Sequence, residues 1–94
     1  MDRMPMTQHA QTRLRQRGIP PDTLALLLEH GCTVHDHRGA EVLYLTRVGR
    51  ENIRRAKGRQ AYRRLESSLN VYAVIDGDGR VITVGHRTHR INRP

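Results

Sequence analysis

The stretch LNVYAVIDGDGRVITVGHR, residues 69–87, decides the fold class of this 94-residue chain. Two runs rich in Val, Ile and Tyr flank residues 76–79, DGDG, whose Asp and Gly residues suit a tight hairpin turn. Both faces of each run carry apolar residues, so the pattern predicts two central strands of a β-sheet. A chain of this length allows one domain with a modest core.

Two further strands are predicted upstream, in residues 32–37 (CTVHDH) and 40–46 (AEVLYLT). Val, Tyr and Thr are frequent in both runs, and Gly39 provides turn freedom in the connection RGA, residues 38–40. Together with the hairpin they predict a small antiparallel sheet of about four strands.

A first helix is predicted over residues 8–17. The Thr7 hydroxyl can accept hydrogen bonds from the free N–H groups of the first turn, and Gly18 is well placed to end the helix. Ala10 and Leu14 form a narrow apolar stripe. His9, Arg13 and Arg17 form a parallel basic stripe.

A second helix is predicted within residues 19–31, IPPDTLALLLEHG. Pro20 and Pro21 fix its start and Gly31 ends it. The side chains expected to face the core are Leu24, Leu27 and Leu28.

Residues 48–68 return to a helical period with a break at Gly58, which predicts two short basic helices. The predicted fold is therefore α+β. An N-terminal helical hairpin packs on a small antiparallel sheet, and the short basic helices are inserted before the last β-hairpin.

The whole chain, residues 1–94, is predicted to be a single domain with its core in residues 7–87 and a basic tail in residues 88–94. Only 3% of residues are aromatic, so the core rests on aliphatic side chains, with three tyrosines as its large members: Tyr44, Tyr62 and Tyr72. A single cysteine, Cys32, excludes an internal disulfide. Because no apolar run reaches the length of a membrane span or signal core, we expect a cytoplasmic protein without a membrane partner.

The formal net charge of +8 predicts a polyanionic partner. Sixteen of the 17 cations are Arg, an excess that codon usage in a GC-rich genome would also produce. Eight cations stand between Arg47 and Arg64 against one acid, Glu51. A charge block of this kind is typical of a surface that a partner neutralises, although a solvated helical face is the simpler alternative.

HAQTRLRQRGI, residues 9–19, and VYAVIDGDGRVITVGHR, residues 71–87, resemble a bacterial family of domains of unknown function with the pattern H-A-x-x-R-x-x-x-R-G-I. That family is related to the RelE/ParE toxins, and the resemblance covers roughly residues 7–91. It implies a RelE/ParE-like fold and a toxin of a toxin–antitoxin system. The implied partners are RNA, including ribosome-associated mRNA, and an acidic antitoxin protein. Such toxins usually open with a strand before the helices, whereas only RMPMT, residues 3–7, precedes the first helix here.

Metal-independent cleavage of RNA through its 2′-hydroxyl needs a base, cations around the phosphorane, and an acid for the leaving oxygen. Our candidate catalytic residues are His9, Arg13 and His86, all within the segments that carry the resemblance. Each has a structural alternative. In it His9 caps or flanks its helix, Arg13, together with Arg17, is solvated or paired with Asp22 or Glu29, and His86 is a buried, hydrogen-bonded side chain.

Two other functions remain open: a basic module that binds nucleic acid without chemistry, and a toxin that acts by protein contact, as the gyrase poisons do. The candidate nucleic-acid-binding residues are Arg17, Arg50, Arg54, Arg55, Arg63, Arg64, Arg87 and Arg90. Convergence of His9, Arg13 and a polar residue of the last hairpin in one cleft would favour the enzyme, whereas a broad patch on the basic helices would favour the module.

His30, Cys32, His35 and His37 are residue types that bind metal ions, but their spacing fits no closed ligand set. We expect no metal or cofactor, and Cys32 is expected to be a small packed residue.

Overall fold

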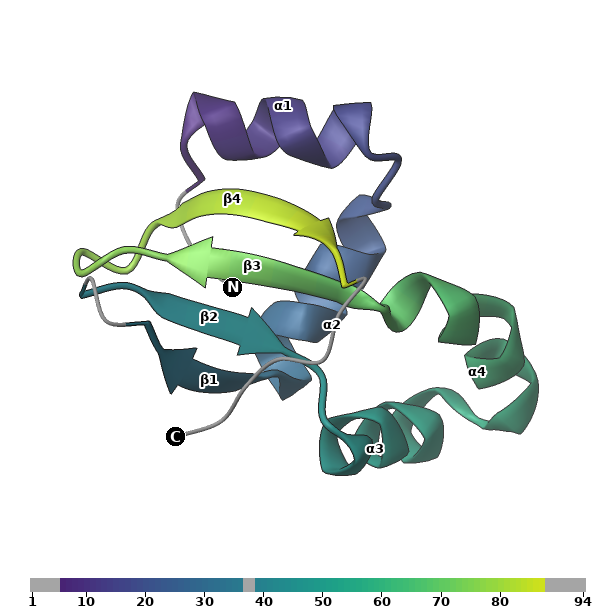
Figure 1. Cartoon of the computed structure of the whole chain (residues 1–94). Coiled ribbons are helices and arrows are strands. Elements are labelled where there is room, and N and C mark those ends of the chain that lie inside the picture. Colours follow the sequence, from purple (N-terminus) through teal and green to yellow (C-terminus); the bar gives the residue numbers. More distant parts are fainter. Residues whose placement is uncertain (1–5, 37–38, 88–94) are drawn as a thin grey trace.

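A computed structural model describes residues 6–36 and 39–87 (Figure 1). The elements follow in the order α1 (Gln8–Gln16), α2 (Pro21–His30), β1 (Cys32–His35), β2 (Glu41–Tyr44), α3 (Arg47–Lys57), α4 (Arg59–Leu65), the 3-10 turn η1 (Glu66–Leu69), β3 (Val71–Ile75) and β4 (Val81–His86). The predicted α+β class is confirmed. The predicted basic tail at 88–94 and the candidate residue Arg90 lie outside the described residues.

The four strands form one antiparallel sheet in the order β1-β2-β3-β4. Tyr44 of β2 stands opposite Tyr72 of β3, which stands opposite Gly85 of β4. β3 is central, as predicted, but the prediction that β4 is also central is wrong. Its outer side carries an isolated parallel bridge from Met6 and is covered by α1, which explains why an outer strand is apolar on both faces.

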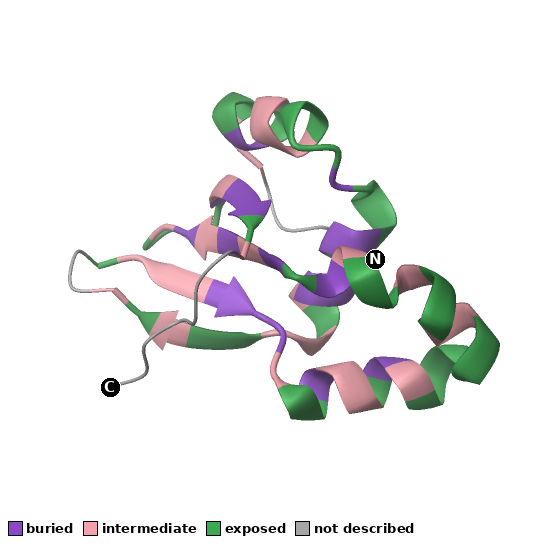
Figure 2. Cartoon of the chain, turned by 45° about the vertical axis from the view of Figure 1, so that its right-hand side comes forward, coloured by how far each residue is buried: buried purple, intermediate pink, exposed green. Residues whose placement is uncertain are grey.

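One face of the sheet forms the core with the helices (Figure 2). β3 alternates strictly, with Val71, Ala73 and Ile75 buried. These side chains cluster with Leu27 of α2 and Ile53 of α3, both almost fully buried. The core is aliphatic, as expected. Of the three tyrosines Tyr44 is buried, whereas Tyr62 and Tyr72 are half-buried.

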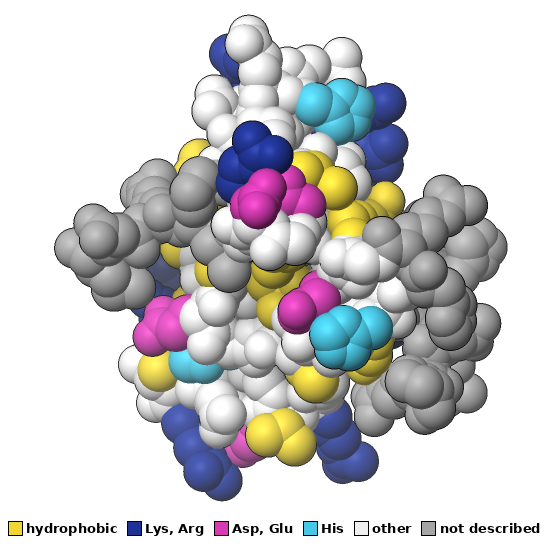
Figure 3. Space-filling model, turned by 90° about the vertical axis from the view of Figure 1, so that its left-hand side faces the viewer, with side chains coloured by type: hydrophobic (Ala, Val, Ile, Leu, Met, Phe, Trp, Pro, Cys, Tyr) yellow, Lys and Arg dark blue, Asp and Glu magenta, His cyan; other side chains and the backbone are white. Residues whose placement is uncertain are grey.

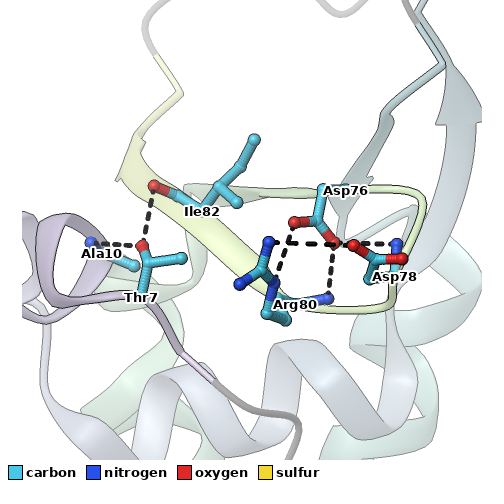
Figure 4. Close-up of polar contacts among 6 residues, drawn as sticks. All are labelled: Thr7, Ala10, Asp76, Asp78, Arg80 and Ile82. Atoms are coloured by element: carbon cyan, nitrogen blue, oxygen red, sulfur yellow. Dashed lines mark hydrogen bonds and ion pairs between the residues drawn. The ribbon is translucent and has the colours of Figure 1, made fainter.

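Helix α1 lies along β4, and its start is tied to that strand (Figures 1 and 4). The Thr7 hydroxyl accepts from the Ala10 N–H at 3.2 Å, as the capping prediction requires. The Thr7 N–H donates to the Val81 carbonyl at 3.0 Å. At the other end Gly18 has φ +63°, the left-handed conformation expected where a helix ends.

Helix α2 contacts β2, α3 and η1, so α1 and α2 make their main contacts with different neighbours rather than with each other. On α2 the side chain of Leu26 is buried while Leu28 is only partly buried, which corrects the predicted core set. At Gly31, just after the helix, glycine is required by lack of space rather than by backbone freedom. Its φ is −73°, but a Cβ there would lie 2.7 Å from the side chain of Leu43.

Helices α3 and α4 project from one end of the sheet, at the right of Figure 1. The predicted break between them is at Gly58, whose φ of +88° places it in a region that L residues rarely adopt. α3 meets the end of α2 through Gly49, where a Cβ would lie only 2.6 Å from the His30 carbonyl oxygen. α3 is therefore held against α2 by a close backbone contact, and α4 packs on α3.

The β3–β4 turn is closed by Asp76 (Figure 4). Its carboxylate accepts from the N–H groups of Asp78 at 3.0 Å and Arg80 at 2.9 Å, and from the Arg80 side chain at 3.1 Å. The N–H donated by Arg80 is the main cause that lowers the pKa of Asp76, opposed by partial desolvation.

Candidate nucleic-acid interface

His9 and Arg13 lie together on α1, as their spacing predicted. The Nε atom of Arg13 donates to Nε2 of His9 at 3.5 Å, and the His9 side chain is exposed. Among the described residues, neither Arg13 nor Arg17 forms an ion pair with Asp22 or Glu29, the pairing considered from the sequence. The first turn of α1 therefore presents an exposed imidazole beside a guanidinium.

His86 lies at the opposite end of α1. Its Nε2 atom is 2.7 Å from the carbonyl oxygen of Arg17, which is the C-cap of α1. The side chain is hydrogen-bonded, as expected, but exposed, which corrects the expectation that it is buried. It is exposed because it is the last residue of β4, beyond the buried Val84 on the same face of the strand.

The candidate acid and base therefore do not meet. His9 and Arg17 are eight residues apart on α1, which is about 12 Å along a helix axis, and the imidazole of His86 is bound at the Arg17 end. A general acid and a general base for one phosphodiester must each reach an atom of the same phosphate or its 2′-hydroxyl within hydrogen-bond distance. Arg13 is close to His9 only.

Arg87 has a structural partner on β2, the buried side chain of Tyr44. Its guanidinium carbon is 5.0 Å from the centre of the Tyr44 ring, and its Nη1 donates to the Leu45 carbonyl at 3.3 Å. Its backbone N–H donates to Asn70 at 2.8 Å. These contacts already occupy the planar guanidinium, so Arg87 is less available for binding a phosphate.

Two of the predicted nucleic-acid-binding arginines on α3 are also engaged. Arg54 Nε donates to Glu51 at 3.1 Å, and a second nitrogen of the same guanidinium contacts the other carboxylate oxygen. Arg50 donates to the side chain of Asn70 at 2.6 Å. The hydrogen bond from Arg54 is the main cause that lowers the pKa of Glu51, and it raises the pKa of Arg54 in turn.

The remaining cations of α3 and α4 are exposed. We call them the α3–α4 basic surface: Arg47, Arg55, Lys57, Arg59, Arg63 and Arg64. Among these six cations, the one ion pair within the described part of the chain joins Arg55 to Glu51 at 3.8 Å, and that carboxylate is shared with Arg54. The charge of Arg47 also acts on Glu51 and helps to lower its pKa. Arg59 and Arg63 are four residues apart on α4 and so share one face of the helix.

The far end of the molecule differs in charge. Seen from the side of the β3–β4 turn, basic and acidic side chains are interspersed (Figure 3). Arg80 pairs there with Asp76 at 3.1 Å and with Asp78 at 3.8 Å. The β3–β4 turn therefore carries mixed charge, whereas six exposed cations lie on α3 and α4 and two more, Arg15 and Arg17, lie at the end of α1.

Comparisons with known proteins do not assign this surface. No family model, curated protein or solved structure matches the chain. In the described ranges, none of the helices is both long and apolar enough to cross a membrane. Residues 6–36 and 39–87 hold no group of three or more His, Cys, Asp or Glu side chains placed to bind a metal ion, and His37 of the candidate metal set lies outside them.

Three members of the α3–α4 basic surface were missed as site residues: Arg47, Lys57 and Arg59. Their exposure separates them from Arg50 and Arg54, which the sequence placed in the same group. One signal was available for Arg54, because Glu51 stands three residues before it and such pairs meet on a helix surface.

Proposed function

We propose that this protein binds RNA through the α3–α4 basic surface and does not cleave it. The observation that carries the proposal is the set of six exposed cations on two consecutive helices, with Glu51 the one acidic residue between Arg47 and Arg64. Such a surface releases counterions from a nucleic-acid backbone, which is the main source of sequence-independent affinity. The surface lies on two helices that project from one end of the sheet.

The cation type favours RNA. Five of the six cations are Arg, whose planar guanidinium forms paired hydrogen bonds with phosphate and stacks on exposed bases. Unpaired, unstacked bases are the usual target of proteins that bind RNA loops and single strands. Duplex DNA offers phosphates but not unpaired bases, so it is the weaker ligand under this proposal.

Binding without cleavage is favoured by the arrangement of α1. A ribonuclease with His9 and His86 as its acid and base would need both imidazoles at one phosphate. His9 lies in the first turn of α1, whereas His86 is hydrogen-bonded to the other end of that helix. The toxin function implied by the resemblance is compatible with RNA binding, and an acidic antitoxin would then compete with RNA for the same basic surface.

The test is a fluorescence anisotropy titration of a labelled single-stranded RNA at several salt concentrations. Removing two phosphate contacts in the variant Arg63→Ala/Arg64→Ala should reduce the slope of log K against log salt by about 1.4, from roughly 0.7 for each contact with a single strand. The matched control is Arg15→Ala/Arg17→Ala, which makes the same charge change on α1.

Equal losses of slope in the two variants would contradict the proposal, because affinity would then follow net charge alone. The same RNA is analysed on a denaturing gel after incubation. Cleavage by the wild-type protein that is lost in His9→Ala would contradict binding without chemistry and would support the ribonuclease.

A further inference from the structure

A hollow of about 410 Å³ lies on the outer face of α3. It is lined by Arg47, Val48, Glu51, Asn52 and Arg55, residues that recur at one face of the helix. Val48 is 69% exposed, and it is the one large hydrophobic side chain that is exposed among the described residues. Packing in the core does not account for an apolar side chain at this position.

The chemistry of the hollow is mixed. Val48 provides an apolar contact, and the exposed amide of Asn52, four residues further along α3, offers a carbonyl acceptor beside two N–H donors. Arg47 and Arg55 stand at the two ends, eight residues or about 12 Å apart along the helix axis. Glu51 also lines the hollow, but its carboxylate is engaged by Arg54 at 3.1 Å.

This set matches a nucleotide better than an isolated phosphate. A phosphate alone would use the arginines and leave Val48 and Asn52 without a role. A base of a single strand has an apolar face for Val48 and a hydrogen-bonding edge for Asn52, while the phosphates on either side of it lie toward the two arginines. An Asn amide complements adenine in particular, which places an N–H₂ donor beside the N7 acceptor.

We propose that this hollow binds one unpaired adenine of the RNA. The inference rests on the proposed function, because the α3–α4 basic surface brings the strand to α3. It adds base selectivity to an affinity that is otherwise independent of sequence. The selectivity resides in Val48 and Asn52, whereas the strength of binding resides in the arginines.

The experiment compares two oligoribonucleotides of equal length, one of uridine only and one with a single central adenosine. The wild-type protein should bind the second roughly ten-fold more tightly, the discrimination typical of one good amide–base pair. In Asn52→Ala the two affinities should become equal while the salt dependence stays as in the wild type. Arg63→Ala/Arg64→Ala is the matched control, which should weaken binding of both oligonucleotides and keep their ratio.

Both variants change exposed side chains, and circular dichroism checks that each is folded. Salt-dependent binding of the wild type with equal affinity for the two oligonucleotides would overturn this inference and leave the proposed function standing. An adenosine preference that survives in Asn52→Ala would overturn it as well. Absence of salt-dependent binding to either oligonucleotide would overturn both proposals.

Discussion

His86 binds the C-terminal end of α1 through the carbonyl oxygen of Arg17, at 2.7 Å from Nε2. The two residues are 69 positions apart in the chain, so this hydrogen bond joins the last strand to the first helix. Thr7 makes the corresponding connection at the start of α1, through its N–H and the Val81 carbonyl at 3.0 Å. α1 is thus fastened to β4 at both ends.

We expect His86→Ala to loosen the end of α1. The loss of one hydrogen bond at an exposed site should lower the free energy of unfolding by about 1 kcal/mol, measured by urea denaturation. Hydrogen exchange of the last-turn amides of α1 should become faster, and RNA binding should be unchanged. The control is His9→Ala, at the opposite end of α1, which should leave the free energy of unfolding near the wild-type value. An equal loss of stability in both variants would contradict the assigned role of His86.

We expect Glu51→Gln to increase RNA affinity. The carboxylate is ionised at neutral pH, since its pKa lies below the ordinary value of 4.5, and it neutralises part of the α3–α4 basic surface. The neutral amide should free Arg54 for one more phosphate contact, which steepens the salt dependence by roughly 0.7. Salt titration by anisotropy measures the change. Asp22→Asn, an equal charge change on α2, should have a smaller effect; an unchanged slope in Glu51→Gln would show that Arg54 does not reach the RNA.

Asp76→Asn tests the turn between β3 and β4. The pKa of Asp76 is lowered from its ordinary value of 3.8 in the folded state, so its carboxylate contributes stability above that value. That contribution is lost as the pH falls through the lower folded pKa. The Tm of the variant should be below that of the wild type at neutral pH, and the gap should narrow below about pH 4. A gap that is the same at all pH values would exclude the charge as its cause.

Gly49→Ala tests the contact between α2 and α3. In an exposed helix this change would stabilise by about 1 kcal/mol, but here the new Cβ would lie 2.6 Å from the His30 carbonyl oxygen. We expect the opposite sign, a loss of about 1–3 kcal/mol from overpacking, measured by urea denaturation. Asn52→Ala, on the exposed face of α3, is the control and should not lose stability. A stabilised Gly49→Ala would mean that α3 moves away from α2 without cost.

Local sequence signals were enough for most of the elements. Thr7 and Gly18 marked the ends of α1, Gly58 marked the break between the basic helices, and residues 76–79 marked the last turn. Each signal acts through neighbouring backbone groups, so it is readable from a few adjacent residues. The fold class followed because such elements combine in few ways.

The arrangement of side chains from distant segments was less accessible. The sequence put His9 and His86 into one candidate site because both residue types suit the same chemistry, whereas the structure holds them at opposite ends of α1. Likewise Arg54 and Arg63 were predicted to act alike, although Arg54 pairs with Glu51 three residues before it and Arg63 is exposed. The position of β4 in the sheet was also predicted wrongly. Apolar residues on both faces of a strand do not reveal whether another strand or a helix covers its edge.

The sequence by itself determined the elements, the α+β class and the basic charge between Arg47 and Arg64, since helix ends, turns and net charge depend on residue type and short spacing. Only the tertiary structure decided which cations are exposed, where the two histidines lie, and that the face of α3 with Val48 and Asn52 is left uncovered. These features depend on how segments far apart in the chain pack, and packing is set by the summed shape of the whole core rather than by any one motif.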